Sequence, residues 1–208
     1  MKKHGKNIWF WLFIILLIGN LLIYSPHYLL YSSDYRKADA IVLFLGPDFT
    51  ARQKEAYKII KEGNVDYLII PAYDKVYKVY DKEIIKSLPS SLALHNTIKK
   101  KLPNSYPYYY EDTHIEAIDA KKTMTDFGLK SAIFISSPYH MRRINLIVSK
   151  VFNGDQSGLY FVPTSYEKAP TNIGELSWVN WKKIGREYGK IIWFSIYMLW
   201  QNKIAPLL

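Results

Sequence analysis

The sequence predicts an α/β domain, with a mostly parallel sheet of about five strands and helices on both faces, preceded by one transmembrane helix. Short apolar runs alternate with helical patterns along the chain, which is typical of a parallel sheet covered by helices. The chain also begins with a basic flank and an uncharged apolar run, which is typical of a membrane anchor. A length of 208 residues leaves room for one domain of ordinary size plus an appendage, and we find no internal repeat.

The amino-terminal run predicts an uncleaved anchor. Residues 1–7 carry three lysines, and Ile8–Tyr24 (IWFWLFIILLIGNLLIY) carries no charge. This run is close to the minimum that spans a bilayer, about 17 residues. A cleaved signal peptide is the alternative, but its apolar region is normally shorter, and no A-x-A-like site follows Leu17. We expect a single pass through the plasma membrane, with the amino terminus cytoplasmic and the soluble domain outside the cytoplasm.

Composition limits the functions that remain. The 208 residues include no cysteine, which excludes disulfides, a thiolate nucleophile and a cysteine metal site. A net charge of +10 fits nucleic acid, an anionic membrane or an anionic ligand. We find no basic-aromatic nucleic-acid motif and expect no nucleic-acid partner. The membrane segment favours a lipid surface or a small anionic, phosphate-bearing ligand.

The first half of the domain predicts a βαβ unit. A polar-aromatic tether, residues 25–37, leads into a buried strand over Ala38–Leu45, with which the α/β domain of residues 38–208 begins. A helix capped by Thr50 and ended by Gly63 follows, and then a second strand over Val65–Ile70. The turn after the first strand lacks G-x-G-x-x-G and any Walker pattern, so dinucleotide or NTP binding is not expected.

The second half continues the alternation after an irregular insertion. The insertion, residues 72–104, contains a helix from about Leu92 to Leu102, and a third strand is expected over Tyr106–Tyr110. Thr113 and Glu116 form a capping-box pattern ahead of the next helix. The remaining elements are a strand over Ala132–Ile135, a helix to about Phe152, a strand over Leu159–Val162 and a helix from Trp178 to about Gln201. In that last helix, the apolar segment Ile191–Trp200 is expected to pack in the core, and an interfacial helix on the same membrane is the alternative.

Polar residues follow the first, third and fourth predicted strands, whose loops can converge at one edge of the sheet. They are Gly46, Asp48 and Arg52; Glu111, Thr113 and Glu116; and Ser136, Ser137, His140 and Arg143. We expect Arg52 and Arg143 to hold an anion, and His140 and Glu111 to carry protons. Caps, turns and ordinary surface positions are the alternative for the same residues. No Gly-x-Ser-x-Gly motif and no metal-ligand spacing is present, so neither a serine hydrolase nor a metal site is expected.

Several of these motifs together resemble one family. ADAIVLFLG, a helix with an early Arg, E-x-T ahead of a helix, SSPYHMRR and GREYGK, over residues 38–193, resemble the YdcF/SanA/ElyC-like family of bacterial envelope proteins. The most specific piece is Ser137-x-x-His140-Met141-x-Arg143. The resemblance implies a Rossmann-like three-layer fold and adds Glu187 to the site of Arg52, Glu111, His140 and Arg143. For some members it also implies S-adenosylmethionine binding and links to envelope polysaccharide or lipid-carrier metabolism.

The chain departs from the family pattern at two loops. Gly46-Pro47 replaces a Gly-Gly pair after the first strand. In Thr113–Ala120, Ile115, Glu116 and Ile118 replace an Asn, a Thr and a Glu of the family pattern. Two functions follow as hypotheses, beside the option of a structural membrane protein whose basic face contacts anionic lipid, and the sequence leaves open whether the protein is an enzyme. The first is a membrane-anchored domain that acts on or binds an anionic, phosphorylated envelope intermediate. The alternative is a non-catalytic module that binds a nucleotide-like or S-adenosylmethionine-like ligand and regulates envelope biogenesis.

Overall fold

The structure, a computed structural model, describes residues 4–79 and 106–204. Its strands form one sheet in the order β3-β2-β1-β4-β5. They are β1 (Ala40–Leu43), β2 (Tyr67–Ile70), β3 (Lys75–Lys78), β4 (Ala132–Ser136) and β5 (Leu159–Pro163). Parallel pairing joins β2 to β1, β1 to β4 and β4 to β5, whereas β3 pairs antiparallel with β2 at one edge. The sheet is therefore mixed, which corrects the mostly parallel sheet expected from the sequence.

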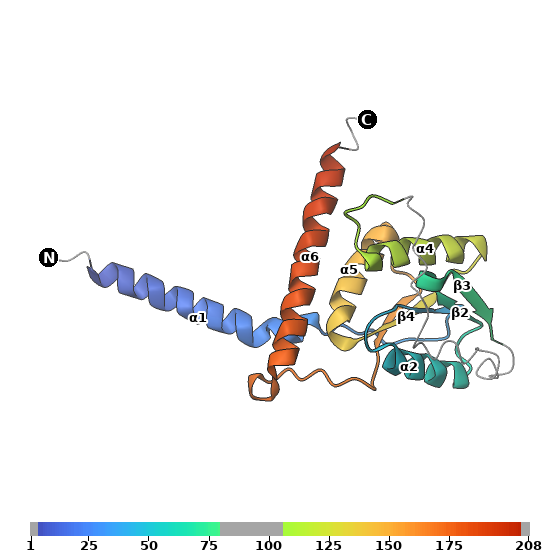
Figure 1. Cartoon of the computed structure of the whole chain (residues 1–208), viewed down its shortest axis with the longest axis horizontal. Helices are drawn as coiled ribbons and strands as arrows, with labels where there is room; N and C mark the ends of the chain where they lie inside the picture. Colours follow the sequence, from blue (N-terminus) through green and yellow to red (C-terminus); the bar gives the residue numbers. More distant parts are fainter. Residues whose placement is uncertain (1–3, 80–105, 205–208) are drawn as a thin grey trace.

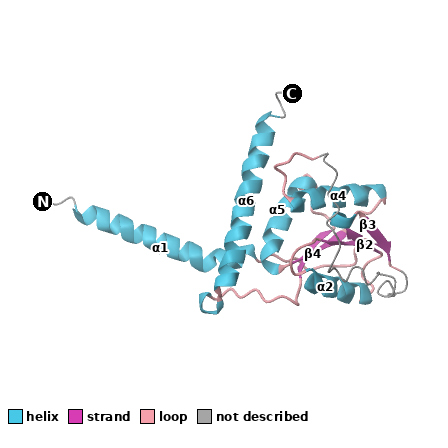
Figure 2. Cartoon of the chain, viewed as in Figure 1, coloured by secondary structure: helices cyan, strands magenta, loops and turns pink. Residues whose placement is uncertain are grey.

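Helices cover both faces of the sheet and make three layers (Figures 1 and 2). The α-helices are α1 (His4–Leu29), α2 (Phe49–Lys61), α4 (Asp112–Asp126), α5 (Met141–Val151) and α6 (Trp178–Ile204). Short 3₁₀ helices are η1 (Pro71–Tyr73), η3 (Pro138–His140) and η4 (Ile173–Glu175). Helix α2 covers one face, and α4 and α5 cover the other together with part of α6 (Figure 2).

The central strands are apolar on both sides because each side meets a helix layer. In β1, Ala40 and Val42 join the cluster under α4 and α5, while Ile41 and Leu43 join the cluster under α2. Successive side chains of a strand point to opposite faces, so a strand buried on both faces must be apolar at every position. This explains why the expected strands around residues 40, 67, 132 and 159 are confirmed, with ends that differ by up to two residues.

The third expected strand is wrong. Residues 106–110 form turns without a strand, and Tyr110 stacks on His114 and Tyr197. The missing strand is β3, which lies within the residues expected to be an irregular insertion. After β2, η1 and Asp74, which adopts a left-handed conformation (φ 52°), reverse the chain, and this makes the antiparallel pair possible. The helix expected over 92–102 lies outside the described residues.

The order of the strands creates a crevice at the carboxyl ends of β1 and β4. The chain runs from β1 outward to β2 and β3, and then crosses back to add β4 on the opposite side of β1. The connections therefore leave β1 and β4 in opposite directions. In open α/β sheets ligands bind at such a switch point.

Helix α1 leaves the domain as a long exposed rod (Figure 1). Among the described residues it is the one helix long and apolar enough to cross a membrane, over Ile8–Leu29, with a mean hydropathy of 2.2. The helix extends to Leu29, which is within the expected tether of residues 25–37. Packing of its last turn against the domain stabilises this extension. Leu29 is buried against Ile184, and the Arg142 guanidinium lies 4.8 Å from the centre of the Tyr28 ring.

The expected core packing of the end of α6 holds for only part of the segment. Phe194 and Tyr197 are buried in the core. Other large apolar side chains of the segment Ile191–Trp200 are exposed, namely Ile192, Trp193, Ile196, Leu199 and Trp200. Only one side of α6 meets the domain, so helical periodicity leaves the other side uncovered.

We expect Gly158→Ala to destabilise the protein more than Gly154→Ala. Both glycines have positive φ (76° and 80°), so an alanine at either costs about 1–2 kcal/mol. A Cβ at Gly158 would also lie 3.1 Å from the Ser131 Cβ and 3.2 Å from the Lys130 carbonyl, whereas a Cβ at Gly154 meets open space. Urea unfolding of the full chain in detergent micelles measures the difference, and equal losses would contradict it.

Candidate functional site

A cavity of about 240 Å³ opens at the crevice between β1 and β4. It lies between the loops after these strands, the first turn of α4 and the side of α6. Nine of the eleven site residues expected from the sequence line it: Gly46, Asp48, Arg52, Thr113, Glu116, Ser137, His140, Arg143 and Glu187. Convergence at one sheet edge therefore brings together residues that are up to 141 positions apart, from Gly46 to Glu187.

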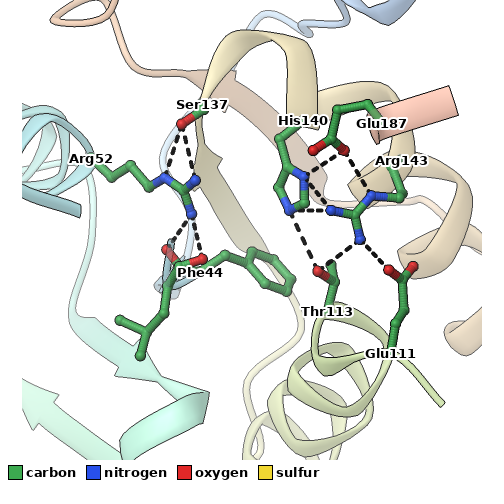
Figure 3. A network of polar contacts seen from close by, with 9 residues as sticks. Phe44, Arg52, Glu111, Thr113, Ser137, His140, Arg143 and Glu187 are labelled. Atoms are coloured by element: carbon green, nitrogen blue, oxygen red, sulfur yellow. Dashed lines mark hydrogen bonds and ion pairs between the residues drawn. The ribbon is translucent and has the colours of Figure 1, made fainter. Parts of the chain in front are cut away.

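Arg143 is the centre of a buried polar network on one side of the cavity (Figure 3). The residue is 1% exposed, and each of its three side-chain nitrogens has a polar contact, with Nη2 lying 3.3 Å from His140 Nε2. Nε donates to Glu187 Oε2 at 2.8 Å, and Nη1 donates to Glu111 Oε2 at 2.5 Å and to Thr113 Oγ1 at 3.0 Å. A buried charge needs such pairing, because removing a charged group from water costs several kcal/mol of free energy. Arg143 thus joins α5, α6 and α4.

His140 and Glu187 form a hydrogen-bonded dyad within this network. His140 Nδ1 lies 2.9 Å from Glu187 Oε2. Arg143 Nη2 lies 2.6 Å from the same nitrogen, but a guanidinium and an Nδ1–H cannot bond each other, because both only donate. An ionised carboxylate can only accept, so in the tautomer that satisfies Glu187 the proton is on Nδ1, which donates a hydrogen bond to Glu187. Nε2 then has a lone pair, and it lies 3.3 Å from Arg143 Nη2 and 3.5 Å from Thr113 Oγ1. This tautomer gives the imidazole the form of a base.

Burial and charge set the protonation states of the dyad. Burial and the neighbouring Arg143 charge lower the pKa of His140 to about 3, although Glu187 opposes the shift. Burial by itself raises the pKa of Glu187, but the hydrogen bond from His140 and the Arg143 charge lower it well below its usual range. The dyad is therefore a neutral imidazole held by an ionised carboxylate.

Arg52 forms a second network on the other side of the cavity (Figure 3). Its Nε and Nη2 donate to Ser137 Oγ at 3.2 and 3.0 Å, and Nη1 donates to the carbonyls of Phe44 and Leu45 at 2.9 and 2.6 Å. A Cβ at Gly46 would lie 2.3 Å from the guanidinium, so a larger residue there would displace Arg52 from these bonds. Arg52 ties the loop after β1 to the loop after β4.

Thr113 and Glu116 do not form the expected capping box. Helix α4 begins at Asp112, with Glu111 as its N-cap and no side-chain capping bond. Thr113 Oγ1 accepts from Arg143, and Glu116 Oε2 accepts from the Leu45 amide at 3.1 Å. Both side chains therefore bond residues outside α4, and neither forms a capping bond with the backbone of its own helix.

Two expected site residues do not line the cavity. Glu111 contacts Arg143. Burial raises the pKa of the Glu111 carboxyl, because its effect is larger than the opposing effect of the Arg143 charge. Ser136 is the last residue of β4 and is fully buried; its hydroxyl has no hydrogen-bond partner in the described part of the chain. Ser136 is therefore a buried residue of the sheet, and its hydroxyl does not line the cavity.

Helix α6 supplies cations that the sequence reasoning missed. Lys183, Arg186 and Lys190 line the cavity together with Glu187. Arg186 and Lys190 are exposed, whereas Lys183 Nζ donates to Glu167 at 2.9 Å and to Asp48 at 3.3 Å. Their spacing of three, four and seven residues puts them on one helix face. The same spacing is visible in the sequence KKIGREYGK, residues 182–190.

We expect the stability of the protein to fall as the pH is lowered from 6.5 to 5. Burial lowers the pKa of His114 to about 4, and that of His140 is about 3, against an ordinary value of 6.5. Below pH 6.5 the unfolded chain binds protons at these positions and the folded chain does not. Each histidine then costs about 1.4 kcal/mol per pH unit. Urea unfolding of the full chain measures the slope, which His114→Phe should roughly halve; an unchanged slope in that variant would refute the assignment.

We expect Glu187→Gln to destabilise the protein by about 3 kcal/mol, because it leaves Arg143 with one of its two buried carboxylate partners. Arg186→Gln on the exposed side of the same helix is the matched control and should stay within about 0.5 kcal/mol of the parent protein. Urea unfolding monitored by circular dichroism measures both. Similar losses would show that the Arg143 network does not hold the fold together.

Comparisons with known proteins add no relative. No family model matches the chain, and neither a curated protein nor a solved structure is found to be similar to it. The resemblance to YdcF-like proteins therefore stays a prediction from the motifs. Within residues 4–79 and 106–204, no group of three or more histidine and acidic side chains is placed to hold a metal ion.

Proposed function

We propose that this chain is a membrane-anchored, Rossmann-like protein that acts on a phosphate-bearing ligand of the cell envelope, with His140 as its proton carrier. The observation that carries the proposal is the His140–Glu187 dyad, buried beside a cavity at the sheet's switch point. Catalytic bases combine this kind of orientation with a shifted pKa. Helix α1 provides the membrane anchor, with the domain outside the cytoplasm.

The dyad is suited to moving one proton. His140 Nε2 takes a proton from a hydroxyl or water in the cavity, and Glu187 stabilises the imidazolium that forms. The same nitrogen returns the proton to a leaving group. Burial, together with the Arg143 charge, keeps the free imidazole neutral, and a phosphate bound in the cavity would raise the pKa of His140 again. The base thus becomes stronger when an anionic ligand is present.

The exposed cations of α6 are the best candidates for contacting the anion. Arg52 and Arg143, which the sequence assigned to this role, are 3% and 1% exposed and bonded to protein groups. Arg186 and Lys190 are exposed and line the same cavity. We therefore assign the direct contact with phosphate to Arg186 and Lys190, and we give Arg52 and Arg143 the role of fixing the walls.

A non-catalytic ligand-binding module is the second candidate. Its support is that His140 is only 8% exposed and is already bonded to Glu187, so little of the ring reaches the cavity. In this function the cavity holds a nucleotide-like or S-adenosylmethionine-like ligand, and binding alone regulates envelope biogenesis. Turnover separates the two candidates, because a module binds its ligand and leaves it unchanged.

We expect a phosphate-bearing compound to stabilise the full chain in detergent micelles. The panel is sugar phosphates, isoprenoid phosphates, nucleotides and S-adenosylmethionine. A ligand at a hundred times its Kd adds about 2.7 kcal/mol of stability, which a thermal-shift assay detects. The double variant Arg186→Gln/Lys190→Gln should lose the shift, and Lys122→Gln on α4, another exposed cation, should keep it. A shift that survives in the double variant would remove α6 from the binding site.

For a compound that binds, we expect His140→Gln to abolish turnover while the thermal shift persists, because glutamine keeps a polar group but cannot carry the proton. Turnover is measured by product analysis of the parent chain and the variant. Binding without turnover in the parent chain would favour the non-catalytic module. Full turnover in His140→Gln would eliminate His140 as the proton carrier.

A further inference from the structure

We infer that the outer face of α6 lies in the lipid–water interface of the membrane that α1 spans. The outer face is defined by exposed side chains of α6: Trp178, Lys182, Ile192, Ile196, Leu199 and Trp200. The inference rests on the membrane anchoring proposed above and not on the identity of the ligand. It gives the domain a second attachment, parallel to the membrane surface.

The two sides of α6 differ sharply in what they meet. Glu187, Phe194 and Tyr197 point into the domain and are at most 6% exposed. On the opposite side Ile196 is 54% exposed and Leu199 is 64% exposed. Residues three and four positions apart form one continuous stripe on a helix. A stripe of aliphatic and tryptophan side chains in water is unfavourable, so a partner of matching chemistry is required.

The charge of α6 identifies lipid as that partner. The exposed charged side chains of its described part, Lys182, Arg186 and Lys190, are all basic. Its one carboxylate, Glu187, is buried and paired with Arg143. A helix with basic residues beside tryptophan and aliphatic residues is typical of an anionic membrane surface. A second protein copy would meet the same unpaired positive charge, because this chain carries a net charge of +10.

The packing of α1 gives α6 the orientation that this contact needs. The last turn of α1 is fixed to α6: the Tyr28 and Tyr188 rings stack at 6.1 Å, and Tyr188 Oη donates to the Ser25 carbonyl at 2.9 Å. In Figure 1, α6 runs across the direction of α1, and the sheet with α2, α4 and α5 lies on the side of α6 away from α1. When α1 crosses a bilayer, α6 therefore lies along its surface, and its uncovered side faces the lipid.

This placement has a consequence for the cavity. Arg186 and Lys190 line the cavity and lie on the same helix as the outer face. A wall of the cavity is then at the depth of the lipid headgroups. A phosphate attached to a lipid could reach these cations without leaving the membrane.

The absence of cysteine allows a direct test with the full chain. Ile196→Cys, Leu16→Cys in α1 and Lys122→Cys on α4 are each labelled with a nitroxide; all three positions are exposed. The chain is reconstituted in vesicles of phosphatidylethanolamine and phosphatidylglycerol. Collision rates with oxygen, which concentrates in lipid, and with a water-soluble nickel chelate are measured. We expect the Ile196→Cys label to collide several-fold less with nickel and more with oxygen than the Lys122→Cys label.

The three labels distinguish the interfacial position of α6 from the membrane anchoring by α1. A Leu16→Cys label that collides freely with nickel would overturn the membrane anchoring itself. If that label is in lipid while the labels at 196 and 122 behave alike, the interfacial helix is overturned and the anchor stands. A third outcome is that the Ile196→Cys label is protected from both reagents and that the unlabelled variant forms disulfide-linked dimers. This outcome would show that the outer face of α6 contacts a second copy of the chain and not lipid.

Discussion

The buried Arg143 guanidinium is the interaction on which the arrangement of the domain depends. It pairs with Glu187 from α6 and Glu111 from the start of α4, and it contacts His140 in η3. These elements come from separate parts of the chain, so one charge holds together the helix layer above the sheet. Burying a charge is favourable only with such partners. Glu187 satisfies Arg143 and orients His140 at the same time, so stability and the protonation state of the site have one physical origin.

Helix α6 connects the three regions that matter for function. Its inner side completes the core through Phe194 and Tyr197 and places Glu187 in the Arg143 network. Its amino-terminal half lines the cavity with Lys183, Arg186 and Lys190 and packs against the end of α1. Its remaining side is apolar, aromatic and basic. A rigid helix with these contacts relates the position of the cavity to the direction of the anchor.

The sequence predicted most strands because their signal is local. A strand buried on both faces must be apolar at every position, and the apolar runs around residues 40, 67, 132 and 159 show this directly. The signal failed for β3 (Lys75–Lys78), whose two ends are exposed lysines and whose two central residues are only half-buried, as an edge strand allows. It also failed at Tyr106–Tyr110, where aromatic residues that favour strands pack instead on His114 and α6.

By itself the sequence determined the apolar helix, the buried strands and the position of polar residues just beyond the ends of β1 and β4. These features follow from hydrophobicity and periodicity, which each segment carries alone. Only the tertiary structure decided the partners. Thr113 bonds Arg143 and does not cap α4, Arg52 and Arg143 are buried in protein contacts, and exposed cations come from α6. The physical reason is that a hydrogen bond or ion pair requires atoms within about 3 Å, and residues far apart in the chain reach that distance only when the sheet and its helices have packed.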